Sequence, residues 1–132
     1  MGLDCSHDAF HGSYGAFSRF RDALVECIGG RVDRGNTFEG EKSYWWFPEG
    51  MNSSTNPGLY EFFSYSDCDG EISPEMCARL ADEMEAILPF VEKWPDNLGG
   101  HIERDGGFVA VTKRWIKGCR AAALEGVPLE FG

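Results

Sequence analysis

Basic residues are scarce in this sequence. Twelve lysines and arginines stand against 22 aspartates and glutamates, which leaves a formal net charge of −10. A protein that binds the phosphates of duplex nucleic acid needs clustered positive charge, so the composition argues against such a partner. The same acidity favours a basic protein surface or a cation as a partner.

Long apolar segments and paired cysteines are also missing. No run approaches the about 20 apolar residues of a membrane-spanning helix, and the N-terminus lacks the basic and apolar regions of a signal peptide. The five cysteines form no Cys-x-x-Cys pair, and an odd number suits a reducing compartment better than a disulfide scaffold. We therefore expect a cytoplasmic protein with no membrane partner.

The motifs of the common enzyme classes are lacking too. The sequence contains no nucleophile elbow, phosphate-binding loop, dinucleotide-binding glycine pattern or zinc-protease motif. Serine, cysteine, histidine and carboxylate side chains are all present, so nucleophilic or general acid–base chemistry stays open. A binding protein is favoured over an enzyme, and no catalytic residue is assigned.

The sequence does contain enough apolar material for one folded domain over residues 1–132. Its 42% hydrophobic and 14% aromatic residues suffice to bury a core. Apolar residues recur at three- and four-residue steps in three long segments, which predicts amphipathic helices over about 14–28, 74–93 and 107–125. Ser13 and Ser73 are the predicted N-caps of the first two.

A short helix and a small β element complete the predicted fold. Asn56 before Pro57 predicts a helix start with Asn56 as the cap. The aromatic run 43–47 predicts a strand, with its hairpin partner expected in 38–42. The expected fold class is thus mainly α (α+β), with three long helices and one short helix around a single core. Charged residues off the first apolar stripe, Arg19, Arg21, Asp22 and Glu26, are expected to face water.

An acidic loop over residues 64–75 joins two predicted helices and resembles a calcium-binding loop. With Gly70 in the sixth position, Asp67 and Asp69 take the third and fifth ligand positions. Tyr65 and Met76 then occupy the first and twelfth positions, where calcium requires acids. Calcium is therefore a weak candidate cofactor. The alternatives are carboxylates that cap the turn and the next helix, or carboxylates that face a ligand or partner.

Two histidines near the N-terminus form a second candidate site. His7 and His11 are four residues apart, with Asp4 and Cys5 nearby, and on a helix that spacing places both imidazoles on one face, as in zinc sites. Further ligands would have to come from a distant residue such as His101. The alternative is a pair of hydrogen-bonded surface histidines.

The aromatic run itself is a third candidate. Strand alternation sends Trp45 and Trp46 to opposite faces, so one of them should lie on the outer side. An exposed indole ring can stack on a base, a sugar or a cation. The alternative is that a helix covers the second face.

Three stretches of the sequence resemble a family of small, uncharacterised bacterial and phage-encoded proteins. They are Gly-Leu-Asp-Cys-Ser-His at 2–7 leading to Phe17-x-x-Phe20-Arg21, Ser-Asp-Cys-Asp-Gly-Glu-Ile at 66–72, and Gly-Cys-Arg-Ala-Ala at 118–122 with Leu-Glu-Phe at 129–131. The resemblance implies no activity. It implies that six residues share one recurring design: Asp4, Ser6, His7, Asp67, Asp69 and Glu71. A phage origin would imply antagonism of host defence.

The function expected from these patterns is non-catalytic binding that sequesters a small nucleotide-like ligand or defence signal. The ligand would lie between the N-terminal loop, the acidic loop and the tryptophan pair, where carboxylates, arginines and an aromatic ring meet its sugar, phosphate and base. The candidate binding residues are Asp4, Ser6, His7, His11, Arg19, Arg21, Trp45, Trp46, Asp67, Asp69, Glu71 and Arg104. The alternatives are an acidic inhibitor that binds a basic partner protein, and a metal-dependent or hydrolytic enzyme.

Overall fold

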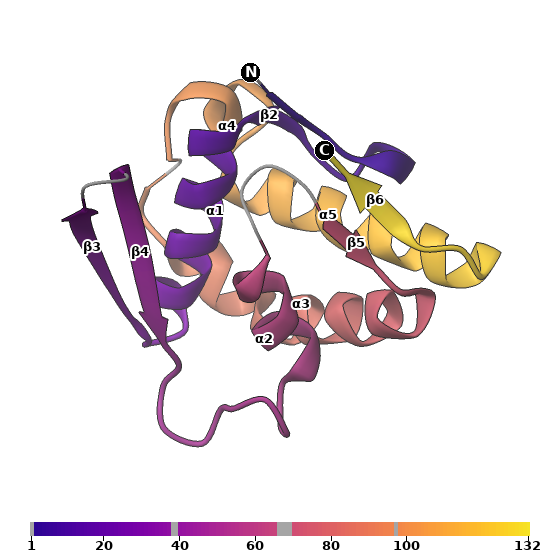
Figure 1. The fold of residues 1–132 in the computed structure, drawn as a ribbon, viewed down its shortest axis with the longest axis horizontal. Coiled ribbons are helices and arrows are strands. Elements are labelled where there is room, and N and C mark those ends of the chain that lie inside the picture. The colour runs from indigo at the N-terminus through magenta and orange to yellow at the C-terminus, as the bar shows by residue number, and fades with distance from the viewer. Residues whose placement is uncertain (1, 38–39, 66–69, 97) are drawn as a thin grey trace.

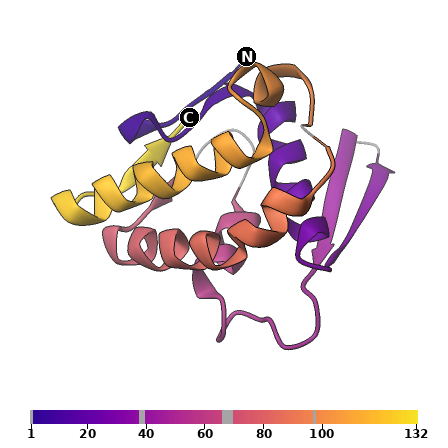
Figure 2. The same cartoon turned by 180° about the vertical axis from the view of Figure 1, so that it is seen from behind.

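Two long helices, α3 (Pro74–Lys93) and α5 (Phe108–Glu125), lie side by side and run in opposite directions (Figure 1, Figure 2). The helices α1 (Tyr14–Cys27) and α2 (Pro57–Ser64) pack against this pair, and the short helix α4 (Gly100–Arg104) precedes α5. The computed structural model describes residues 2–37, 40–65, 70–96 and 98–132. The predicted mainly α fold with a small β element is confirmed.

The described residues also form three two-stranded antiparallel sheets, which lie around the helices. The strands β1 (Gly2–Asp4) and β2 (His11–Ser13) flank a single 3-10 turn, η1 (Ser6–Asp8), while β3 (Arg31–Thr37) pairs with β4 (Gly40–Trp46) and β5 (Gly70–Ile72) with β6 (Leu129–Phe131). An isolated bridge between Cys5 and Phe131 joins the first and last of these sheets. The two ends of the described chain therefore meet.

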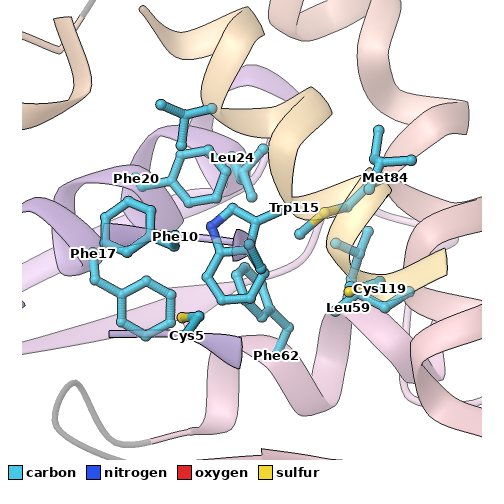
Figure 3. Packing of buried hydrophobic residues seen from close by; sticks show 14 of the residues in the cluster. Cys5, Phe10, Phe17, Phe20, Leu24, Leu59, Phe62, Met84, Trp115 and Cys119 are labelled. Carbon is cyan, nitrogen blue, oxygen red and sulfur yellow. The ribbon is translucent and has the colours of Figure 1, made fainter. Parts of the chain in front are cut away.

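The core is built around Trp115 of α5, whose side chain is fully buried (Figure 3). Its ring centroid lies 4.9 Å from that of Phe62 on α2 and 5.6 Å from that of Phe17 on α1. Phe10 and Phe131 contact the same indole at 5.9 and 6.4 Å. Because these rings come from both ends of the chain and from three helices, one aromatic cluster holds the elements together.

The predicted caps of the long helices are confirmed. Ser13 Oγ accepts from the Ala16 N–H at 3.0 Å, and Ser73 Oγ accepts from the Met76 N–H at 3.2 Å. Each hydroxyl thereby satisfies one N–H that the first helical turn leaves without a partner. Gly126 ends α5 in the left-handed conformation, with φ 71°.

The predicted cap of α2 is wrong. Asn56 makes no side-chain cap hydrogen bond. Instead the carboxylate of Glu83 on α3 accepts from the N–H groups of Gly58 at 2.9 Å and Leu59 at 3.1 Å. A carboxylate at a helix N-terminus satisfies these donors and also opposes the positive end of the helix dipole, so a tertiary contact replaces the local cap.

The predicted hairpin partner is also wrong. Trp46 pairs with Arg31 and Trp45 with Val32, so β4 pairs with the segment 31–37 rather than with 38–42. A partner that directly abuts the aromatic run would leave no residues for the turn, and an antiparallel hairpin needs at least two.

Two segments expected as loops contain regular structure. The acidic loop includes β5, because residues 70–72 find a partner in β6, and the 96–107 segment includes α4. No helix in the described part of the chain is long and apolar enough to cross a membrane.

Candidate functional site

The residues predicted to share one ligand site are not brought together, and most of those that the structure describes lie in two separate regions. The β3–β4 hairpin, which carries Trp45 and Trp46, and the η1 turn, which carries Ser6 and His7, lie at opposite ends of the longest axis of the molecule in both views (Figure 1, Figure 2). Asp67 and Asp69 fall outside the described residues. We therefore describe the two regions in turn.

An aromatic pocket lies between the end of β4 and α2. Its walls are Trp45 and Phe47 from the hairpin segment and Tyr60 and Phe63 from the helix, with Ser64 at the side, and its volume is about 190 Å³. Ring centroids within the walls are 6.2 Å apart for Trp45 and Phe63 and 6.1 Å apart for Phe47 and Tyr60. The space between these elements is thus lined by ring faces and edges but not filled by them.

The indole of Trp45 is held from behind by α1. Its N–H donates to Asp22 Oδ1 at 2.7 Å, and Asp22 is only 2% exposed. A charge-assisted hydrogen bond in a buried setting fixes the ring plane strongly. The prediction that Asp22 faces water is therefore wrong, because its carboxylate is the buried acceptor for this indole.

Arg21 supports the same wall and is 1% exposed, so the prediction that it faces water is also wrong. Its guanidinium donates to the carbonyl oxygens of Phe62 at 3.2 Å and Tyr65 at 2.6 Å, and its Cζ lies 5.2 Å from the Trp45 ring centroid. Carbonyls at a helix C-terminus favour a cation. In this arrangement Arg21 ties α1 to the end of α2 rather than reaching the surface.

Trp46 points the other way, as strand alternation predicts. It is 44% exposed, and the guanidinium carbon of Arg31 lies 4.2 Å from its ring centroid. Of the tryptophan pair, Trp45 lines the pocket and Trp46 lies on the outer face, which confirms that one of the two is outside.

The second region is a polar network on the η1 turn. It brings together Asp4, Ser6, His7 and His11, four of the predicted site residues. His11 lies between two carboxylates, with Nδ1 paired to Asp4 and Nε2 at 2.8 Å from Asp8 Oδ1. The network holds the N-terminal turn in one arrangement, since every one of these side chains has a polar partner.

His7 stands in an unusual backbone conformation and links three elements. Its φ is 59°, in the left-handed region, and the next residue has φ 57°. Its Nδ1 lies 2.9 Å from Ser6 Oγ and its Nε2 lies 2.8 Å from Glu125 Oε2 on α5. Ser6 Oγ also accepts from the Glu130 N–H of β6 at 2.9 Å. Strain of this kind persists where the surroundings over-determine it, and it is common at functional sites.

Asp8 is central to this network but was not a predicted site residue. The Arg114 guanidinium donates to its carbonyl oxygen at 2.7 Å and to its carboxylate at 2.6 Å. Hydrogen bonds from Arg114, and then from His11, hold the pKa of Asp8 below its usual value of 3.8. Asp8 and Arg114 are 106 residues apart, so no local pattern could pair them.

The chain of Ser6, His7 and Glu125 has the composition of a nucleophile–base–acid relay. Both heavy-atom distances lie within hydrogen-bond range, and the imidazole of His7 is only 14% exposed. The same hydroxyl also anchors β6, which gives Ser6 a structural role. In this arrangement the His7 imidazole can accept a proton from the Ser6 hydroxyl, or the hydrogen bonds can simply hold the turn in place.

The remaining predicted residues lie apart from both regions. Glu71 is exposed on β5, opposite Glu130, and so lies one strand away from the backbone that Ser6 binds. Arg19 lies on α1 beside Gly100, and Arg104 is exposed at the end of α4. The described residues contain no group of three or more histidines, cysteines and acids arranged to hold a metal ion.

Sequence patterns missed most of the pocket wall. Tyr60 and Phe63 were predicted to lie in a short apolar helix and Ser64 in the acidic loop, and only the adjacent hairpin makes them a pocket. Phe47 belongs to the aromatic run 43–47, and this run was the only part of the sequence pattern that indicated an aromatic site here.

A comparison of the chain with models of known protein families, with curated proteins and with solved structures finds no match in any of the three.

Proposed function

We propose that the protein binds, without converting it, a small ligand with a planar ring, which stacks in the aromatic pocket against Trp45. The observation that carries the proposal is the fixed indole: a buried carboxylate 2.7 Å from its N–H holds the ring in place beside a pocket of about 190 Å³. A pre-oriented aromatic wall loses little entropy when a ring stacks on it. Nucleobases are rings of this kind.

The polar edge of the pocket supports a ligand that donates hydrogen bonds. Ser64 Oγ donates to the Tyr60 carbonyl at 2.8 Å, so its lone pairs remain able to accept from a ring amine. Among the described residues no basic side chain lines the pocket, and the chain carries a net charge of −10. The pocket therefore favours a nucleoside-like ligand over the corresponding phosphorylated nucleotide. Binding without conversion would lower the free concentration of such a molecule, which is the sequestering role expected from the sequence.

Two tyrosines of equal exposure provide a matched test. Tyr60 lines the pocket and is 50% exposed, while Tyr44 lies on the hairpin outside the pocket lining and is 51% exposed. We expect Tyr60→Ala to weaken the binding of adenosine or guanosine roughly 5- to 150-fold, as for the loss of a stacking ring, and Tyr44→Ala to leave it unchanged. Calorimetric titration of the nucleosides and their 5′-monophosphates measures both effects.

Fluorescence gives an independent readout of the same site. A ring stacked on Trp45 should quench its emission, so the quench should survive Trp46→Phe and disappear in Trp45→Phe. Equal affinity in the two tyrosine variants, together with no quench in the wild type, would refute the proposal. A complex with a basic protein that weakens as salt rises would instead support the predicted inhibitor.

The relay on the η1 turn favours a second candidate, the hydrolytic enzyme. In that case Ser6 Oγ would add to an ester carbonyl while its proton passes to His7, whose imidazolium is stabilised by Glu125. The alcohol would leave with that proton, and water would release the acid from the acyl-serine. The test is turnover of p-nitrophenyl acetate and labelling by a fluorophosphonate. Turnover and labelling that disappear in Ser6→Ala would support an esterase, and their absence in the wild type would exclude this role.

A further inference from the structure

A positively charged hollow lies between the η1 turn and the outer face of α5, away from the aromatic pocket. It is lined by His7, Asp8, Ala110, Lys113, Arg114 and Lys117, and its volume is about 310 Å³. The sequence has only 12 basic residues against 22 acids, yet three of the twelve face this one hollow. Such local concentration of one charge in a protein of opposite net charge creates a local positive potential.

Two of these bases form no ion pair with another described residue. Lys113 and Lys117 are exposed and one helical turn apart, so their ammonium groups lie on the same face of α5. Neither lysine has an ion-pair partner among the described residues. Like charges at this spacing repel each other, and a bound anion relieves that repulsion.

The third base is held in a fixed position. Arg114 binds Asp8 through Nε and one terminal nitrogen, at 2.7 and 2.6 Å. Its other terminal nitrogen lies 3.7 Å from Asp105, which is longer than a hydrogen bond. The guanidinium therefore keeps donors beyond those that bind Asp8, on a side chain that is already ordered.

The acids near the hollow do not neutralise the lysines. The carboxylate of Asp8 is shared between His11 and Arg114, and Glu125 faces the Nε2 of His7. The turn that carries His7 and Asp8 has positive φ at both residues, and these ion pairs hold it there. Within the described part of the chain, the acids near the hollow are therefore paired, whereas its two lysines are not.

We propose that this hollow binds a phosphate monoester dianion between Lys113 and Lys117. The two ammonium groups carry two positive charges, which a doubly charged anion balances and a single carboxylate does not. Lysine is also a common phosphate ligand. A volume of about 310 Å³ accommodates the phosphate and a small organic group. The described residues that line the hollow include no phenylalanine, tyrosine or tryptophan, so its ligand differs from the stacked ring of the aromatic pocket. The inference does not depend on the proposed function.

Thermal unfolding in inorganic phosphate tests the inference. Phosphate and sulfate stabilise many proteins by exclusion from the surface, so the comparison needs a matched variant. Lys113→Ala with Lys117→Ala removes two positive charges from the hollow, and Arg79→Ala with Lys93→Ala removes two exposed charges from α3. At constant ionic strength, phosphate tenfold above its dissociation constant should raise the melting temperature of the wild type and the α3 variant by roughly 3 to 6 °C more than that of the hollow variant.

The inference would be overturned if phosphate raised the melting temperature of all three proteins equally. It would also be overturned if the two double variants lost the same part of the phosphate-dependent rise. Far-ultraviolet circular dichroism checks that both variants fold, which is expected because alanine favours helices. Glycerol 3-phosphate and vesicles that contain phosphatidic acid then identify the source of the phosphate. Lysine-dependent binding of the soluble ester alone assigns a phosphorylated small molecule, and lysine-dependent sedimentation with the vesicles assigns a lipid headgroup.

Discussion

Trp45 donates its indole N–H to Asp22 across 2.7 Å, and the carboxylate that accepts it is 2% exposed. Asp22→Ala leaves a partly buried indole N–H without its acceptor, so the free energy of unfolding should fall by about 1–3 kcal/mol. Asp22→Asn keeps a carbonyl acceptor and should lose less. Urea unfolding measures both values, and an equal loss in the two variants would show that the hydrogen bond is not the source of the effect.

The carboxylate of Glu83 caps α2 from another helix. Glu83→Ala leaves the N–H groups of Gly58 and Leu59 without their acceptor, so it should lower the free energy of unfolding by about 1–2 kcal/mol. Asn56→Ala is the control, because the Asn56 side chain makes no cap bond, and it should change stability by less than about 0.5 kcal/mol. If chemical denaturation showed a larger loss of stability for Asn56→Ala than for Glu83→Ala, Asn56 would be the cap of α2 after all.

Replacing either of two helical glycines by alanine should change the stability of the protein, with opposite signs at the two positions. A Cβ on Gly118 of α5 would lie 2.6 Å from the Cβ of Ala9, so Gly118→Ala should destabilise the protein by about 1–3 kcal/mol. A Cβ on Gly15 of α1 would meet only the Ser13 hydroxyl at 3.9 Å, so Gly15→Ala should stabilise it by about 0.5 kcal/mol. Thermal unfolding distinguishes the two, and the same sign for both would contradict the packing.

Asp8 should contribute to the acid side of the stability curve. Arg114 and His11 hold its pKa below 3.8 in the folded state, so the stability it contributes is present above the unfolded pKa and lost as pH falls through the lower folded value. Asp8→Asn should therefore flatten the loss of stability below about pH 4.

The control for this pH dependence is Glu92→Gln, a change at an exposed acid on α3. Urea midpoints measured from about pH 5 to pH 2 give the slope for each protein, since linkage relates slope to bound protons. If Asp8→Asn and Glu92→Gln change the slope equally, the pairing of Asp8 with Arg114 is not what matters.

The long helices could be predicted because their information is local. The apolar steps of α1, α3 and α5 and the caps Ser13 and Ser73 all lie within a few residues of the structure they determine. The cap of α2 depends on Glu83, which is 24 and 25 residues from its partners, and the local Asn-Pro signal therefore indicated the wrong residue.

The site was harder to predict because it depends on which segments meet. Strand alternation correctly sends one tryptophan outward, but it does not indicate that Asp22 lies behind Trp45. Charged residues off an apolar stripe usually face water, and Arg21 departs from this rule because the end of α2 offers it carbonyl acceptors. His7 and Glu125 are 118 residues apart and could be joined only by the fold.

The bridge between Cys5 and Phe131 has a consequence for synthesis. These residues are 126 positions apart (131 − 5), so Cys5 is made long before its bridge partner. At usual rates of translation the interval is roughly 6 to 25 s, while local helices form in less than about a millisecond. The contacts of Cys5 and Ser6 with β6 therefore form only after β6 has left the ribosome.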